Sequence, residues 1–259
     1  MNWSAVDLAI LLPAFAAGVL VLATHVPLGA QVLRKGIVFI DLAIAQIAGL
    51  GVIVAGMLDI EPSGWQVQVA AALAALAGAL LLTWTEKKWP EVQEAQIGVL
   101  FVLAATAGIL LLAKNPHGGE NLRDLLAGQI LWVSYPRLAV PLAVTVLTLA
   151  LLWGLRGRLS QIGFYLIFAL AVTASVQLVG VYLVFATLIV PALGARKHPE
   201  RLRVALAYGI GLAGYASGLV LSSALDLPSG ALIVWCLAVI AVISHAMAPH
   251  ADPLTAEQA

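Results

Sequence analysis

The chain of 259 residues is 62% hydrophobic and 10% charged, with a mean hydropathy of +1.03. An ordinary soluble domain is about 45–50% apolar and about 25% charged, so this composition excludes a water-soluble globule and indicates a membrane protein. The 13 basic and 13 acidic residues cancel, so no net field attracts nucleic acid or an acidic partner. A single cysteine, Cys236, excludes an internal disulfide and any metal site built from several cysteines.

Runs without charged residues mark the membrane crossings, because a helix that spans about 30 Å of hydrocarbon needs about 20 apolar residues. Eight such runs follow one another: 8–33, 42–58, 62–85, 95–113, 138–155, 159–195, 204–225 and 227–251. The run 159–195 has 37 residues, which is too long for one ordinary crossing and enough for two short ones with a break near 177–180. We therefore predict an all-α, polytopic transmembrane helix bundle with nine crossings, and eight as the alternative.

Basic residues predict the orientation of this bundle. With nine crossings and the N-terminus outside, ten Lys and Arg residues face the cytoplasm and three face outward, as the positive-inside rule requires. The ten are Arg34, Lys35, Lys87, Lys88, Arg156, Arg158, Arg196, Lys197, Arg201 and Arg203, and the three are Lys114, Arg123 and Arg137. The C-terminus is then cytoplasmic. Residues 1–248 form one transmembrane domain, and the polar tail 249–259 is expected to be disordered.

Two further segments have patterns that can be interpreted. Leucines at helical spacing in residues 121–133, after an Asn suited to cap a helix, predict a short amphipathic helix that lies on the outer membrane interface. Residues 209–214 spell GxGxxG inside an apolar run with no preceding strand, so they indicate close helix packing, together with Gly218, rather than a dinucleotide site. No Walker A, GxSxG or HExxH sequence occurs, which favours a protein that is not an enzyme.

Polar groups within the apolar runs are the candidate functional residues, because a charge inside a bilayer is retained where it faces a cavity or a partner. Asp41 is the one formal charge that can enter a crossing. It either pairs with Arg34 or Lys35 at the interface, or it lines a pathway and binds a metal ion. Gln46 and Gln177 either line the same pathway or hold helices together.

Several blocks of the sequence resemble the membrane permeases of zinc- and manganese-type ABC importers. These blocks are Pro27-Leu28-Gly29 with Gly51, Glu94-Ala95-Gln96-Ile97-Gly98 with Gly108, residues 126–134, residues 179–184 with 188–192 and Ala195-Arg196, and Gly218-Leu219 with Ser222 and residues 226–231. They occur in order over about 200 residues of the chain.

The resemblance implies a permease of the bacterial inner membrane that moves zinc, manganese or iron inward. It implies a homodimer in membrane lipid, a cytoplasmic ATP-binding subunit that uses the ATP, an extracytoplasmic metal-binding protein, and no cofactor bound by this chain. The alternatives are the same architecture with a non-metal substrate, and a carrier that works without an ATPase.

Two departures from the family bear on this interpretation. The family carries an Asp four residues before a His on its second helix, and an ungapped alignment from Pro27 places Leu42 and Gln46 there. Asp41 and Gln46 lie five residues apart, about 140° around a helix, so they do not replace that pair directly. The family also has a longer cytoplasmic stretch with a helix that inserts into the ATPase. Here the expected coupling residues are Arg156, Arg158 and Gln161 in a short connection, with Arg196 and Arg201 in the next cytoplasmic loop.

Overall fold

The computed structural model describes residues 7–58, 65–112, 125–155 and 158–248, which form helices and turns without a strand. Its α-helices are α1 (Leu8–Lys35), α2 (Ile40–Met57), α3 (Trp65–Lys88), α4 (Gln93–Leu112), α6 (Ala139–Gly154), α7 (Gln161–Val179), α8 (Val181–Ala195), α9 (Glu200–Leu225) and α10 (Ser229–Ala246). Three 3-10 turns are η2 (Pro90–Val92), η3 (Ile130–Trp132) and η4 (Tyr135–Leu138). The predicted all-α transmembrane bundle is therefore confirmed.

Eight of the described helices are long and apolar enough to cross a membrane, and α8 is a shorter apolar helix. The predicted break in the long run 159–195 is confirmed, because Gly180 alone separates α7 from α8. With 15 residues, α8 is about 22 Å long and does not reach across the whole hydrocarbon layer. The two predicted counts, eight and nine, thus differ in whether this short helix is included.

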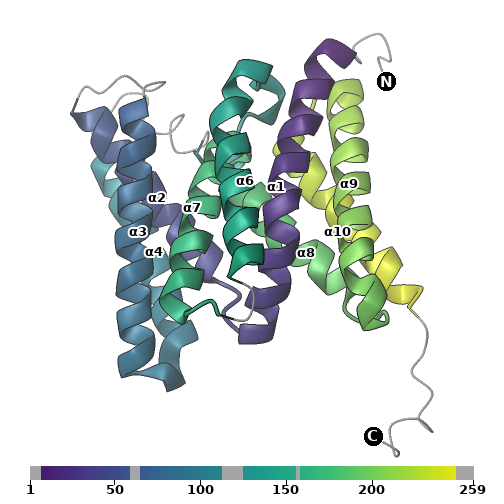
Figure 1. Ribbon diagram of the computed structural model, residues 1–259. Helices are drawn as coiled ribbons and strands as arrows, with labels where there is room; N and C mark the ends of the chain where they lie inside the picture. Colours follow the sequence, from purple (N-terminus) through teal and green to yellow (C-terminus); the bar gives the residue numbers. More distant parts are fainter. Residues whose placement is uncertain (1–6, 59–64, 113–124, 156–157, 249–259) are drawn as a thin grey trace, which may run out of the picture.

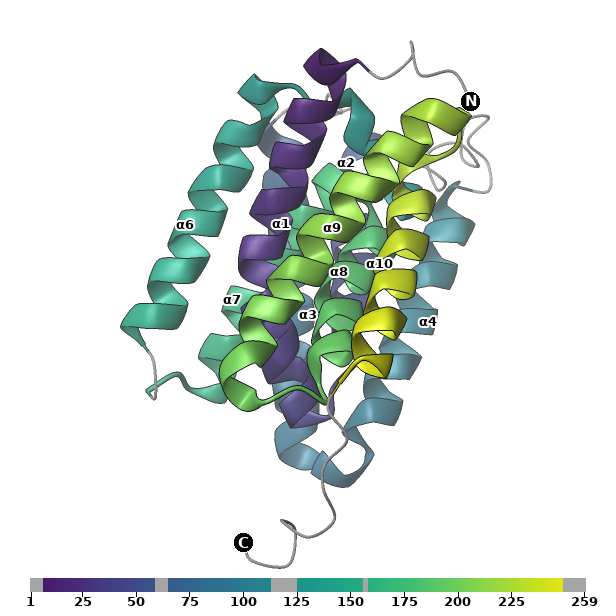
Figure 2. The ribbon, with the colours of Figure 1, turned by 90° about the vertical axis from the view of Figure 1, so that its right-hand side faces the viewer.

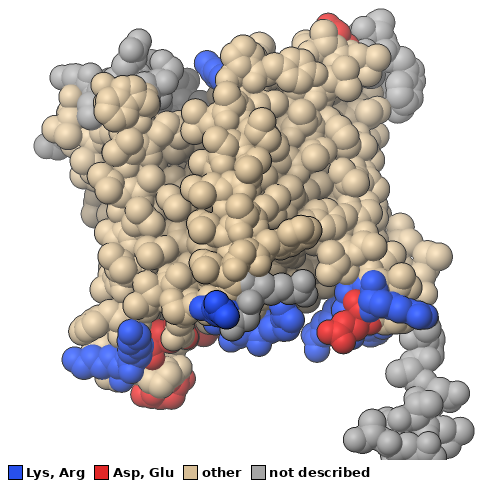
Figure 3. All heavy atoms as spheres, in the orientation of Figure 1, with Lys and Arg blue, Asp and Glu red and all other residues tan. Residues whose placement is uncertain are grey.

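Charged side chains gather at one end of the bundle, at the bottom of Figure 3. We call this end the basic end, because the C-terminal turns of α1 and α3 there carry Arg34, Lys35, Lys87 and Lys88. Helix α1 begins at the opposite end and α10 finishes at the basic end (Figure 1). This arrangement agrees with an odd number of crossings. Which end faces the cytoplasm stays a prediction.

Close helix packing depends on small residues. Helices α9 and α10 lie side by side (Figure 2), where a Cβ at Gly218 would come within 2.5 Å of the Ile233 Cα. A Cβ at Gly214 would meet the Leu237 side chain of α10. Gly214 and Gly218 therefore have the predicted packing role, whereas Gly209 has nothing near its Cβ position.

The outer segment 121–133 differs from its prediction. Residues 121–124 lie outside the described residues, 125–127 are helical, and Gly128 adopts a left-handed φ of 66° before the η3 turn. Ile130 is completely buried, and Leu125 contacts Gly49 of α2. The described part therefore packs one side against the bundle, while Trp132 is 78% exposed. Leucine spacing could not reveal this, since an apolar face suits protein neighbours as well as lipid.

Candidate functional site

Asp41 is buried completely in the first turn of α2. Both carboxylate oxygens lack a hydrogen-bond partner among the described residues. The interfacial ion pair is not formed: the Arg34 Nε donates to the Ala30 carbonyl over 3.2 Å, and the Lys35 Nζ lies 5.1 Å from the centre of the Phe164 ring. The positive end of the α2 dipole favours a carboxylate at this position. A buried acid without a partner is nevertheless costly, so Asp41 is the strongest candidate for cation contact.

The start of α2 is fixed by an acidic residue of another helix. The Phe39 backbone N–H donates to Glu94 Oε1 of α4 over 3.3 Å, and the other Glu94 oxygen is buried without a partner. Next to Glu94 in the sequence, the Gln93 Nε2 donates to the Tyr165 hydroxyl of α7 over 2.6 Å. Glu94 belongs to a block that carries the family resemblance, and the structure assigns it this contact with α2.

Gln46 and Gln177 are not brought together with Asp41 by a hydrogen bond. Gln46 is buried on α2, and its side chain makes no hydrogen bond to a described residue. Gln177 lies on α7 just before the break, with a buried Nε2 that has no partner in the described part of the chain. Within that part, no group of three His, Cys, Asp or Glu side chains could hold a metal ion. A preformed metal site of that kind is therefore absent from the described residues.

His25 of α1 is a buried polar residue that was not among the predicted site residues. It lies ten residues before the end of α1 and is completely buried. Its Nδ1 is 3.0 Å from the Val21 carbonyl oxygen and 3.0 Å from the Thr24 hydroxyl, while Nε2 is buried without a partner among the described residues. Its position inside the apolar run 8–33 was the available signal, since an ionisable group at that depth needs an explanation.

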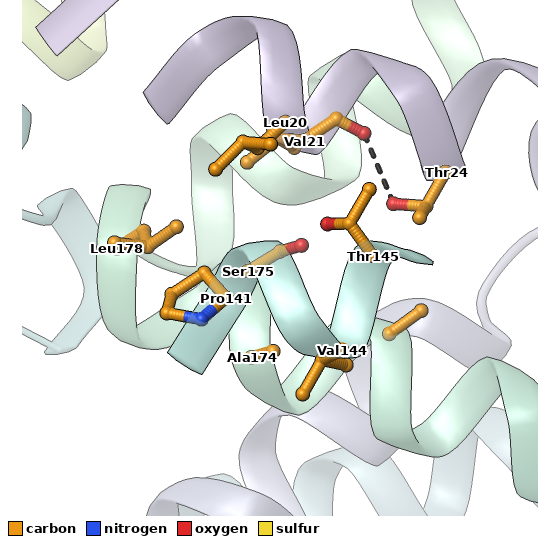
Figure 4. A pocket seen from close by; sticks show the side chains of 10 residues that line it. Leu20, Val21, Thr24, Pro141, Val144, Thr145, Ala174, Ser175 and Leu178 are labelled. Atoms are coloured by element: carbon orange, nitrogen blue, oxygen red, sulfur yellow. Dashed lines mark hydrogen bonds between the residues drawn. The ribbon is translucent and has the colours of Figure 1, made fainter. Parts of the chain in front are cut away.

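A small cavity lies beside this part of α1, between α1, α6 and α7. Figure 4 shows the hydroxyl-bearing side chains Thr24, Thr145 and Ser175 among its lining residues. Its volume of about 10 Å³ is enough for about one water molecule. It is therefore too small to be a passage for a substrate in this conformation.

A junction of three glycines joins the outer segment to the break between α7 and α8. Gly128 and Gly180 both have positive φ values, 66° and 80°, and a Cβ on either one would overlap the backbone of the other segment. A Cβ on Gly230, in the first turn of α10, would meet the Ala127 carbonyl oxygen. The sequence contained these glycines in the resembling blocks, but their mutual contact is a tertiary feature. The junction fixes the position of α8 relative to α10.

The predicted coupling residues lie at the basic end. Arg158, Arg196 and Arg201 are exposed, and Gln161 begins α7 directly after the Ser160 cap. Arg156 lies outside the described residues. The described residues 155 and 158–160 of the connection between α6 and α7 contain no helix, so the family's inserted helix has no counterpart there. In the next loop, His198 Nε2 lies 2.9 Å from the Ser244 carbonyl oxygen and holds the loop to α10.

These features define a polytopic helical membrane protein with polar groups buried in the bundle. The chain matches the ABC 3 transport family over residues 7–164 and 148–248. It therefore belongs to the ABC 3 transport family.

Relatives of known name cover nearly all of the chain. The manganese transport system membrane protein MntC of Halalkalibacterium halodurans is 25% identical over 249 residues, with 88% of this chain and 84% of that protein covered. The high-affinity zinc uptake system membrane protein ZnuB of Haemophilus influenzae is 23% identical over 257 residues, covering 91% and 96%. A chain of PsaBC from Streptococcus pneumoniae, solved in complex with Fab, superposes with a TM-score of 0.75 at 20% identity, covering 96% and 94%. This last likeness shows that the fold is shared.

Proposed function

We propose that the chain is the membrane permease of an ABC importer and that it moves a divalent metal ion inward, driven by ATP that a separate subunit hydrolyses. The match to the ABC 3 transport family over residues 7–164 and 148–248 carries this proposal. The names of the relatives, which refer to manganese and zinc transport, favour a metal substrate. The zinc, manganese and iron ions remain the candidate substrates.

In the proposed assembly, two copies enclose one pathway in the membrane. An extracytoplasmic metal-binding protein delivers the ion to the end opposite the basic end, and an ATP-binding subunit docks at the basic end. There Arg158, Gln161, Arg196 and Arg201, together with Arg156, contact the ATPase. The exposure of Arg158, Arg196 and Arg201 supports this role.

The proposed pathway includes Asp41, Gln46 and Gln177. An anionic carboxylate offsets the charge of a cation that has left water, and carboxylate oxygens are suitable ligands for hard and borderline divalent ions. The absence of a partner for Asp41 among the described residues supports its availability for such a contact. Because few protein ligands are present, the ion would keep part of its hydration shell or gain ligands from the second copy.

Two observations favour other candidate functions. The described residues contain no group of three metal-binding side chains, which favours the same permease architecture with a non-metal substrate. The connection between α6 and α7 is short, which favours a carrier that works without an ATPase.

Metal content in cells tests the substrate. A strain without this chain, starved of metal, is expected to contain less zinc, manganese or iron than its parent, and a plasmid copy is expected to restore the loss. Unchanged contents of all three metals would contradict a metal substrate and support the non-metal alternative.

A further inference from the structure

An apolar groove runs between α1 and α6 in the half of the bundle away from the basic end. Its volume is about 700 Å³, and it is lined by Leu12, Phe15 and Ala16 of α1, Tyr135 of η4, and Ala139 and Leu142 of α6, among others. Leu12 and Leu20, which also lines the groove, are eight residues apart, so the groove extends about 12 Å along α1. It lies within a membrane-spanning part of the chain, where its surroundings are lipid chains and other apolar surfaces.

The η4 turn, which contributes to this groove, also carries a cationic residue. The Arg137 side chain is exposed, and its guanidinium makes no hydrogen bond or ion pair with a described residue. It belongs to the η4 turn, whose residues Tyr135 and Leu138 line the groove. The turn precedes the first residue of α6, so Arg137 lies near the membrane surface while the groove descends below it. The Tyr135 hydroxyl is the one polar side-chain group in the lining.

We propose that this groove binds a phospholipid, with one acyl chain along α1 and α6 and the phosphate on Arg137. Guanidinium groups form strong charge-assisted hydrogen bonds to phosphate. A tyrosine with its ring against the apolar chain and its hydroxyl near the headgroup is typical of a membrane interface. Arg137 is a cation whose guanidinium has no described partner, and it lies in the turn that supplies Tyr135 and Leu138 to the groove. This charge favours an anionic phosphate over a neutral apolar occupant.

Native mass spectrometry of the detergent-solubilised full chain tests this site with two probes, phosphatidylglycerol and a diacylglycerol with the same acyl chains. We expect one tightly retained phosphatidylglycerol per chain and weak retention of the diacylglycerol. Arg137→Ala is expected to lower phosphatidylglycerol retention by about tenfold, the factor that the loss of one charge-assisted hydrogen bond brings. Arg137→Lys keeps the charge and is expected to retain most of the binding.

The groove itself is tested from α6. Ala139→Phe fills it, whereas Val140→Phe changes the next residue, which is exposed and does not line the groove. Retention of the lipid should fall in Ala139→Phe and persist in Val140→Phe. Equal retention in the wild-type protein, Arg137→Ala and Ala139→Phe would overturn the proposal. Separation of two associated copies by Ala139→Phe alone would also overturn it, because a second copy would then occupy the groove.

Discussion

At the scale of single residues, Asp41 combines complete burial with two carboxylate oxygens that have no described partner. The burial of Asp41 lowers the free energy of unfolding, because an unpaired buried charge costs more than a neutral group of the same shape. Residues that reduce stability in this way are common at functional sites. Transport and stability should therefore respond in opposite directions when the carboxylate is replaced.

The first prediction concerns Asp41→Asn. Uptake of the metal should fall by about tenfold or more, since a lost charge-assisted contact costs about 1.5–3 kcal/mol. The melting temperature in detergent should stay the same or rise, because the buried charge is gone. Asp226→Asn is the matched control: Asp226 is exposed in a left-handed conformation with φ of 53°, which Asn accepts. Normal uptake by Asp41→Asn would remove Asp41 from the pathway.

The partners of single residues were the least predictable feature. The sequence indicated that Asp41 is special because it lies at the edge of an apolar run, but it left open an ion pair with Arg34 or Lys35. In the structure, Arg34 bonds to the Ala30 carbonyl and Lys35 lies over the Phe164 ring. The Lys35 contact depends on how α1 and α7 pack. His25 was not predicted as a site residue, because its depth depends on where α1 ends, at Lys35.

At the scale of elements, the sequence predicts the break between α7 and α8. It does not predict the contact that holds this break in place. A run of 37 residues must bend or break, and Gly180 is the residue that permits it. Its φ of 80° and ψ of 163° lie in a region that is almost exclusive to glycine. The contact with Gly128 joins residues far apart in the sequence, so no local pattern could reveal it.

The second prediction uses this junction. Gly180→Ala adds a strained backbone and a methyl group that overlaps the outer segment, and should destabilise the protein by about 3 kcal/mol or more. Gly36→Ala is the control, because Gly36 also has a positive φ, 71°, but has open space around its Cβ position. It should cost about 1–2 kcal/mol. Equal losses in melting temperature for the two variants would show that the close contact contributes nothing.

The third prediction concerns the contact between α9 and α10. Gly218→Ala places a methyl group against the Ile233 backbone and should destabilise the pair by about 1–3 kcal/mol through overpacking. Gly209→Ala lies on the same helix with nothing near its Cβ position, so it should leave the melting temperature unchanged or raise it, because Ala favours the helix. If both variants melt alike, glycine at position 218 is not needed for packing.

The fourth prediction concerns the loop between α8 and α9. The contact of His198 with the Ser244 carbonyl ties this loop to α10, so His198→Ala should increase hydrogen exchange in residues 196–203 and leave the centre of α9 protected. Unaltered exchange in the loop would mean that other contacts hold it. A loop that is less ordered should also weaken binding of an ATPase at Arg196 and Arg201.

At the scale of the whole molecule, the composition and the spacing of the apolar runs were sufficient to predict the helical bundle. The orientation rests on the asymmetry of basic residues, and it can be measured in a Cys236→Ser background. In this fifth prediction, a membrane-impermeant maleimide should label Ser134→Cys in intact cells and Lys197→Cys only after permeabilisation. Both positions are exposed. The opposite labelling pattern would reverse the orientation and place the basic end outside.

We propose that this chain works as the permease of an ABC importer despite its short connection between α6 and α7. The most direct test is purification of the tagged chain from its native membrane, with bound chains identified by mass spectrometry and bound metals by elemental analysis. We expect an ATP-binding subunit at one copy per permease. A folded chain that is recovered alone and free of metal would instead favour a carrier without an ATPase.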